Sequence, residues 1–425
     1  MKRIFSNTRM SFTLAALLAW GGVLASPAAG QDLEIHGFTE GAFGSRIEDN
    51  DLMGDTESTM NEARLQLQLS KYGDRGQFFS SVDFTKDNAL DGETLTELRE
   101  AYFQIGLGEH ADAKIGRQVL TWGVGDLVFI NDLFPKDYIS FFVGREDPYL
   151  KRPSDAVKLR FFTPVADIDL VTIPYFEPDT LPTGDRLSYY NPFMGGAVGP
   201  NSQPAMRRPA NSLDNSEIAL RAYRYLGNFQ GSLYLFRGFY KSPYGMDPAA
   251  GSLYYPDLSA YGASVRGPML SGVVSAEYGM YDSREDRDGD DPFVPNSQHR
   301  YLVGYERQWW TDFTGGVQFY GEFMQDHDKY TASLPAGSPE SDEIRQLVTA
   351  RATQQLLYQT LQVSLFAFFS PTDEDWHLRP AVIYKFSDAV STSVGGNVFG
   401  GEETHTLFGQ FQDNTNLYTR FRYAF

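Results

Sequence analysis

The chain of 425 residues contains no cysteine. That absence excludes a disulfide framework, a thiolate metal site, a c-type haem attachment and a lipid-modified N-terminal cysteine. After the first 30 residues the sequence also lacks an apolar run of about 18 residues, which a membrane-spanning helix requires. Basic residues are scarce, because 36 Lys and Arg stand against 55 Asp and Glu, a net charge of −19. Proteins that bind nucleic acid are normally basic, so the charge argues against a nucleic-acid partner.

Glycine and aromatic residues are abundant instead. The 40 glycines, 32 phenylalanines and 25 tyrosines favour turns and strands over helices. A soluble chain of this length would ordinarily divide into two or three domains. The strand pattern favours one domain that spans residues 31–425.

Residues 1–30 have the composition of a targeting segment. Basic residues come first, an apolar stretch follows from Phe12 to Ala25, and small residues such as Ala28 and Gly30 precede Gln31. This order predicts a cleaved signal peptide and an exported protein. A retained N-terminal membrane anchor is the alternative.

Segments of about ten residues alternate between apolar and polar side chains, as in the strands of outer-membrane barrels. Within 60–71, for example, Ala63, Leu65 and Leu67 fall on one face, and Glu62 and Arg64 fall on the other. The pattern predicts an all-β, transmembrane antiparallel β-barrel of about 18 strands (16–18). The predicted strands cover 33–46, 60–71, 76–86, 96–107, 111–120, 156–163, 166–176, 214–226, 229–241, 258–267, 270–282, 298–309, 313–327, 345–354, 359–370, 376–387, 390–399 and 415–425.

The connections between these strands alternate in length. Every second joint has only two to four residues, whereas most of the others are long, and 371–375 is the one short joint where a long one is expected. Short periplasmic turns and long extracellular loops are typical of bacterial barrels. A soluble β-sandwich could produce similar strands but gives no reason for this alternation.

The C-terminal strand ends in an aromatic residue. Leu417, Phe421, Tyr423 and Phe425 alternate with polar residues up to the last position. Such an ending fits recognition by the barrel-insertion machinery through strand addition. We therefore expect the protein to reside in the cell outer membrane, in contact with lipid and lipopolysaccharide.

Three early segments resemble the alginate-export-like and porin-like barrels of Gram-negative bacteria. They are Glu97–Tyr102, Lys114–Gln118 and Trp122–Gly123, and the ending from Phe399 to Phe425 is similar in character. The resemblance implies an outer-membrane channel, and for the alginate exporter an eighteen-stranded barrel with an arginine-rich lumen. The exporter's individual binding residues do not map onto this sequence.

Basic residues on the polar strand faces would line the lumen. The last five predicted strands supply bases without a lumen acid, whereas the first four supply mainly acids. An arginine wall opposite an acidic wall would orient dipolar solutes. Alternatively, the last arginines simply pair with Glu34 or Glu40 where the first and last strands meet. The bases expected on the solute path are Arg64, Lys158, Arg160, Arg221, Arg351, Arg379, Lys385, Arg420 and Arg422.

Two long loops, 121–155 and 177–213, could narrow the lumen. The first mixes apolar and charged residues, so we expect it to fold inward. Its candidate constriction residues are Trp122, Asp126, Asp132, Lys136 and Arg145.

Catalytic and metal-binding patterns are weak. Asp286, Asp288 and Asp290 have spacing similar to a Ca²⁺ loop but lack the downstream glutamate of an EF-hand, so a solvated acidic loop is the simpler interpretation. His327, between two aspartates, is the one candidate for a barrel hydrolase, which also needs acids opposite it. We expect no cofactor and no enzymatic activity.

The sequence therefore predicts a porin-like channel for hydrophilic solutes, anionic or sugar-like. An exporter of an anionic polysaccharide is the alternative within the same class. An outer-membrane hydrolase acting at His327 is the alternative from another class.

Overall fold

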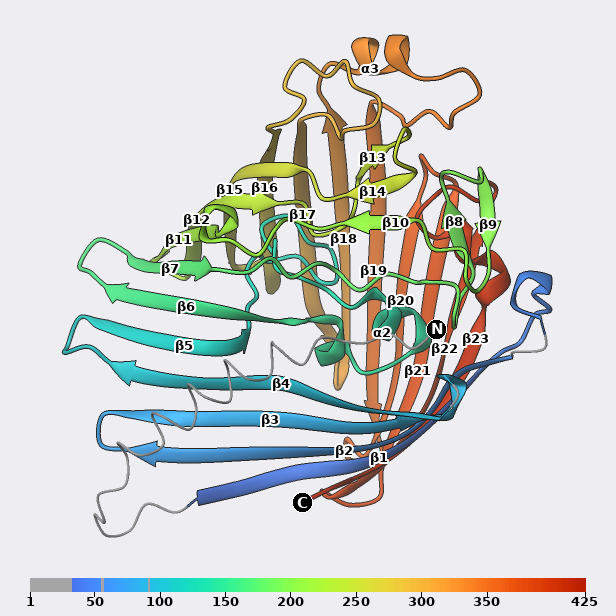
Figure 1. The fold of residues 1–425 in the computed structure, drawn as a ribbon. Helices are drawn as coiled ribbons and strands as arrows, with labels where there is room; N and C mark the ends of the chain where they lie inside the picture. The colour runs from blue at the N-terminus through green and yellow to red at the C-terminus, as the bar shows by residue number, and fades with distance from the viewer. Residues whose placement is uncertain (1–32, 55–56, 91) are drawn as a thin grey trace.

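The computed structural model describes residues 33–54, 57–90 and 92–425 (Figure 1). The predicted signal peptide, residues 1–30, lies outside the described residues. Among those described, no helix is both long and apolar enough to cross a membrane.

Eighteen antiparallel strands form one closed barrel, and β23 closes it by pairing with β1 (Figure 1). The predicted eighteen-stranded barrel is confirmed. Its strands are β1 Leu33–Arg46, β2 Ser58–Gly73, β3 Gly76–Asp87, β4 Glu93–Gly106, β5 Ala111–Val119, β6 Pro153–Phe162, β7 Asp167–Ile173, β11 Glu217–Leu226, β12 Phe229–Phe239, β15 Asp257–Met269, β16 Gly272–Ser283, β17 Gln298–Trp310, β18 Phe313–Met324, β19 Ile344–Leu356, β20 Leu361–Ser370, β21 Asp375–Lys385, β22 Val390–Gly401 and β23 Asn416–Ala424.

Strand boundaries differ from the prediction by a few residues. β7 stops at Ile173 rather than at residue 176, because Pro174 has no N–H to continue the ladder. β15 continues to Met269 and β16 begins at Gly272 rather than at residue 270, so the turn lies at Leu270–Ser271, where both residues have positive φ (53° and 60°). Two successive positive φ values are the geometry of a tight type I′ hairpin.

Side-chain alternation separates an outer face from the lumen. On β12, Leu233 and Leu235 are 64% and 46% exposed, whereas Tyr234 and Phe236 are buried. The outer side chains are available to lipid, and the inner ones pack against chain inside the barrel.

That inner chain is the loop between β5 and β6, residues 120–152, which we call L3. Its helix α2, Tyr138–Val143, begins at Asp137, whose side chain accepts from the Ser140 N–H, and ends at Gly144, with φ +88°. Phe134, Phe141 and Phe142 are buried in the core, and α2 lies within the ring of strands (Figure 1). L3 therefore occupies the lumen rather than the rim.

The other long loops gather at one end of the barrel, the loop end, and the short turns lie at the opposite turn end. Loop 174–216 and loop 240–256 carry short strands, and α3 follows β18 (Figure 1). These elements are β8 Tyr189–Asn191, β9 Gly196–Val198, β10 Ala205–Arg207, β13 Gly245–Asp247, β14 Ser252–Tyr254 and α3 His327–Ser333.

Candidate solute channel

L3 is fastened to the β16 wall through one buried carboxylate. Glu277 is 4% exposed and accepts hydrogen bonds from the backbone N–H groups of Val124, Gly125 and Asn131 at 2.8, 3.2 and 2.8 Å. The Asn131 side-chain amide donates a fourth at 2.9 Å. Because these donors would otherwise be buried without partners, Glu277 fixes the course of L3 across the lumen.

A second attachment lies on β18 and β19. The Arg351 guanidinium donates to both carboxylate oxygens of Asp126, at 2.6 and 2.9 Å. Gln318 accepts from the Asp126 N–H at 2.7 Å and donates to its carbonyl at 2.9 Å. Both side chains of the ion pair remain partly exposed, so this bidentate pair borders open lumen.

The other arginines of the last strands hold the second half of L3. Arg379 pairs with Asp147 at 3.0 Å, and Glu146 pairs with Arg422 at 2.6 Å and with Arg420 at 3.7 Å. Four of the five bases predicted for this wall therefore lie against acidic residues of L3. The alternation of side chains along the strands could not predict these partners, because they belong to a loop.

The acidic wall of β2 and β3 binds a basic residue from L3 in return. Arg145 donates from Nε to both oxygens of Glu62 at 3.0 and 3.2 Å. Arg64 pairs with Glu62 at 2.8 Å and with Asp83 at 3.2 Å, and the Tyr149 hydroxyl donates to Asp83 at 2.8 Å. The two walls of opposite charge therefore hold L3 between them.

The seam between the first and last strands also carries an ion pair. Arg422 on β23 lies 2.7 Å from Glu40 on β1. The same arginine binds Glu146 of L3, so the pairing expected at the seam is present for Arg422.

Three of the five predicted constriction residues are buried inside L3. Asp132 and Lys136 pair at 3.0 Å and are 5% and 2% exposed. Trp122 is 8% exposed and packs edge-on against Phe134, with ring centroids 5.1 Å apart. They build a small core for the loop, whereas Asp126 and Arg145 attach the loop to the wall.

Three predicted lumen bases converge on one carboxylate. Asp169 on β7 is fully buried and lies 3.4 Å from Lys158, 2.9 Å from Arg160 and 2.7 Å from Arg221. Three cations around one anion leave local positive charge on this part of the wall. The ninth predicted base, Lys385, is exposed at the turn end of β21.

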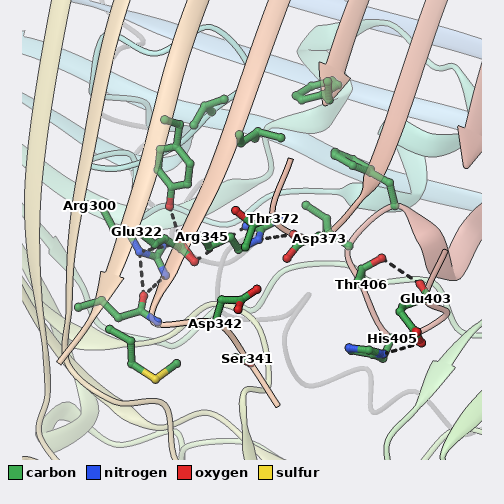
Figure 2. A pocket seen from close by; sticks show the side chains of 18 of the residues that line it. Arg300, Glu322, Ser341, Asp342, Arg345, Thr372, Asp373, Glu403, His405 and Thr406 are labelled. Atoms are coloured by element: carbon green, nitrogen blue, oxygen red, sulfur yellow. Dashed lines mark hydrogen bonds and ion pairs between the residues drawn. The ribbon is translucent and has the colours of Figure 1, made fainter. Parts of the chain in front are cut away.

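A cavity of about 820 Å³ lies on the loop-end side of L3. Figure 2 shows Arg300, Glu322 and Arg345 pointing toward one another on its wall, with Asp373 beside Arg345. Glu322 is 3.3 Å from Arg300 and 3.9 Å from Arg345, and Arg345 is 2.5 Å from Asp373. Arg345 and Asp373 were not anticipated from the sequence, because they lie at a strand start and in a short loop, where face alternation gives no signal.

A segment of L3, 124–129, separates this cavity from a smaller one. Leu127 and Phe129 line the large cavity, whereas Val124 and Asp126 line a cavity of about 50 Å³ on the turn-end side. Leu127 has a positive φ of 59°, which is uncommon for a residue with a side chain. This segment of L3 therefore lies between the two cavities.

The calcium-site candidate is the loop that contains Asp286, Asp288 and Asp290, and in it the oxygens of Asp286 bind backbone N–H groups. The Asp286 carboxylate accepts hydrogen bonds from the N–H groups of Gly289, Asp290 and Asp291 at 2.9–3.3 Å. Its oxygens stabilise the turn of its own loop, and no group of three His, Asp or Glu residues in the described chain is placed to hold a metal. The backbone carbonyl oxygen of Asp288 accepts a hydrogen bond from the Lys329 ammonium group at 2.8 Å.

His327 is the first residue of α3. Its Nε2 lies 2.8 Å from the carbonyl oxygen of Ser341, and its ring packs near that of Tyr330. The hydrolase alternative at this residue stays a prediction.

The fold is shared with solved outer-membrane porins, although no protein-family model and no curated protein sequence matches the chain. OccK5 (OpdH) of Pseudomonas aeruginosa superposes with a TM-score of 0.54 at 8% identity, covering 93% of this chain and 97% of its own. OccAB4 of Acinetobacter baumannii also gives 0.54, at 10% identity, covering 94% of this chain and 100% of its own. At such low identity the similarity establishes one thing, that the chain has the β-barrel fold of outer-membrane porins.

Proposed function

We propose that this protein is an outer-membrane channel that passes small hydrophilic solutes through the gap between L3 and the barrel wall. The observation that carries the proposal is the position of L3, held by ion pairs on opposite walls inside a closed barrel. An inward loop of this kind narrows the lumen and leaves charged and polar side chains at its narrowest point.

The sequence predicts anionic or sugar-like solutes. Because most of the predicted lumen bases are paired with acids, we favour sugar-like solutes over anionic ones. Eight of the nine predicted lumen bases form ion pairs in the described part of the chain. They are Arg64, Lys158, Arg160, Arg221, Arg351, Arg379, Arg420 and Arg422. The positive cluster around Asp169 is the feature that favours anions, and it also supports the alternative of an anionic-polysaccharide exporter.

Single-channel recording tests the channel itself. Refolded protein in a planar bilayer should give discrete conductance steps in KCl, and the heat-denatured protein should give none. Absence of conductance from folded protein would contradict the proposal.

Charge selectivity should respond to the arginines bound by L3. In the Arg351→Gln, Arg379→Gln double variant, Asp126 and Asp147 lose their partners and their negative charge is exposed in the passage. We expect the reversal potential in a KCl gradient to move toward cation selectivity, because local charge sets the ion concentration in a confined pore. Arg237→Gln, on the exposed outer face of β12, is the control. An unchanged reversal potential in the double variant would show that these arginines do not border the ion path.

Outer-membrane location and assembly can be tested at the C-terminus. The backbone of Phe425 pairs with Gly37 at 2.9 and 3.0 Å, while its ring is 46% exposed. Phe425→Ala should therefore leave the purified barrel foldable in detergent but lower its amount in the outer-membrane fraction of cells. Equal amounts of the variant and the wild type in that fraction would show that assembly does not depend on the Phe425 ring.

A further inference from the structure

We propose that the large loop-end cavity is a binding site for an uncharged, sugar-like solute before it passes L3. The inference rests on the proposed channel function and names a solute class for it. Its volume, about 820 Å³, is within the range of small-molecule sites.

Two separate segments of the chain contribute aromatic rings to the lining of the cavity. Tyr240 and Tyr244 come from loop 240–256, with ring centroids 5.7 Å apart and planes at 88°, and Tyr244 is 58% exposed. Tyr138 and Phe141 come from L3. The C–H faces of a pyranose pack against aromatic rings, so these surfaces suit a sugar ring.

Polar groups on the wall are held in fixed positions. Arg300, Glu322, Arg345 and Asp373 form one chain of ion pairs across β17, β18, β19 and the β20–β21 loop (Figure 2). Two bases and two acids leave this chain neutral overall. Guanidinium and carboxylate groups fixed in this way offer both donors and acceptors to sugar hydroxyls.

The rim of the cavity disfavours anions. The two arginines on the wall are already paired with acids, whereas six further carboxylates on the rim are exposed. These exposed carboxylates are Glu340, Asp342, Glu343, Glu374, Glu402 and Glu403. This negative potential lowers the local concentration of anionic solutes. The cavity therefore fits a neutral sugar better than a sugar acid.

Calorimetry on the refolded protein in lauryldimethylamine oxide, a detergent without a sugar headgroup, tests the site with four probes. Lactose should bind with a Kd on the order of 1 mM or tighter. Lactobionate, in which the glucose unit is opened and oxidised to a carboxylate, should bind at least about tenfold more weakly than lactose and more weakly than lactitol, its uncharged open-chain counterpart, and tetraethylammonium should not compete with lactose. Equal binding of lactose and lactobionate, or binding of tetraethylammonium alone, would overturn the proposal.

Two variants connect lactose binding to the cavity. Tyr244→Ala should weaken lactose binding about tenfold by removing an aromatic face. Tyr138→Ala, which removes an aromatic face on the L3 side of the cavity, should also weaken it about tenfold. Tyr175→Ala, an exposed tyrosine outside the cavity, is the control. Unchanged lactose affinity in both cavity variants would place lactose elsewhere.

The binding assay and the channel assay fail independently. Conductance without detectable lactose binding would reject this site and leave the channel in place. Lactose binding without conductance would reject the channel and leave the site.

Discussion

Replacing Glu277 by alanine should release the first half of L3 from the wall and increase the single-channel conductance. The carboxylate accepts three backbone N–H groups and one side-chain amide of L3 inside the barrel. Without it these donors are left unpaired, at a cost of about 1–3 kcal/mol for each buried group. The folded barrel itself should persist, because its eighteen-strand ladder does not include these bonds.

Bilayer recording and urea unfolding measure this effect together. We expect a larger and noisier conductance in Glu277→Ala and a decrease in the free energy of unfolding of about 3 kcal/mol or more. Glu306→Ala, which removes another lumen carboxylate on β17, is the matched control. Wild-type conductance in Glu277→Ala would contradict the role of Glu277 in holding the constriction.

Breaking the ion pair between Arg145 and Glu62 should destabilise the folded protein. Arg145→Met leaves the Glu62 carboxylate, whose side chain is 2% exposed, with Arg64 at 2.8 Å and Arg186 at 3.9 Å. Removal of the single partner of a buried charge costs about 3–5 kcal/mol, and because two arginines remain here we expect a loss near the lower end, about 3 kcal/mol. The midpoint of urea unfolding should fall accordingly, and L3 should become sensitive to protease.

The double variant Arg145→Met, Glu62→Gln separates lost packing from an uncompensated charge. Because it removes both charges, we expect it to recover part of the stability that Arg145→Met loses. A double variant that is as unstable as the sum of the single variants would show that the two residues do not interact.

The barrel could be predicted from the sequence because its signals are local. An alternation of period two, tiny turns and long loops are all properties of neighbouring residues, and these gave all eighteen strands. Boundaries were less accurate where a single residue decided them, as Pro174 does at the end of β7.

The interior could be predicted only in part because its contacts are not local. Asp126 and Arg351 were each named as candidates, but 225 positions separate them and no sequence pattern indicates their pairing. Lys136 was expected at the constriction and is buried, because the loop has a core of its own. Arg345 was missed because it stands at the start of a strand.

Solute flux through proteoliposomes tests the central claim most directly. Vesicles that contain the refolded protein should swell in isotonic lactose and stay constant in an isotonic high-mass dextran, because the proposed passage beside L3 would admit a disaccharide and exclude a polymer. Swelling in lactose should be faster in Glu277→Ala than in the wild type. Vesicles that do not swell in lactose, although the barrel is folded and inserted, would contradict the account of this protein as a solute channel.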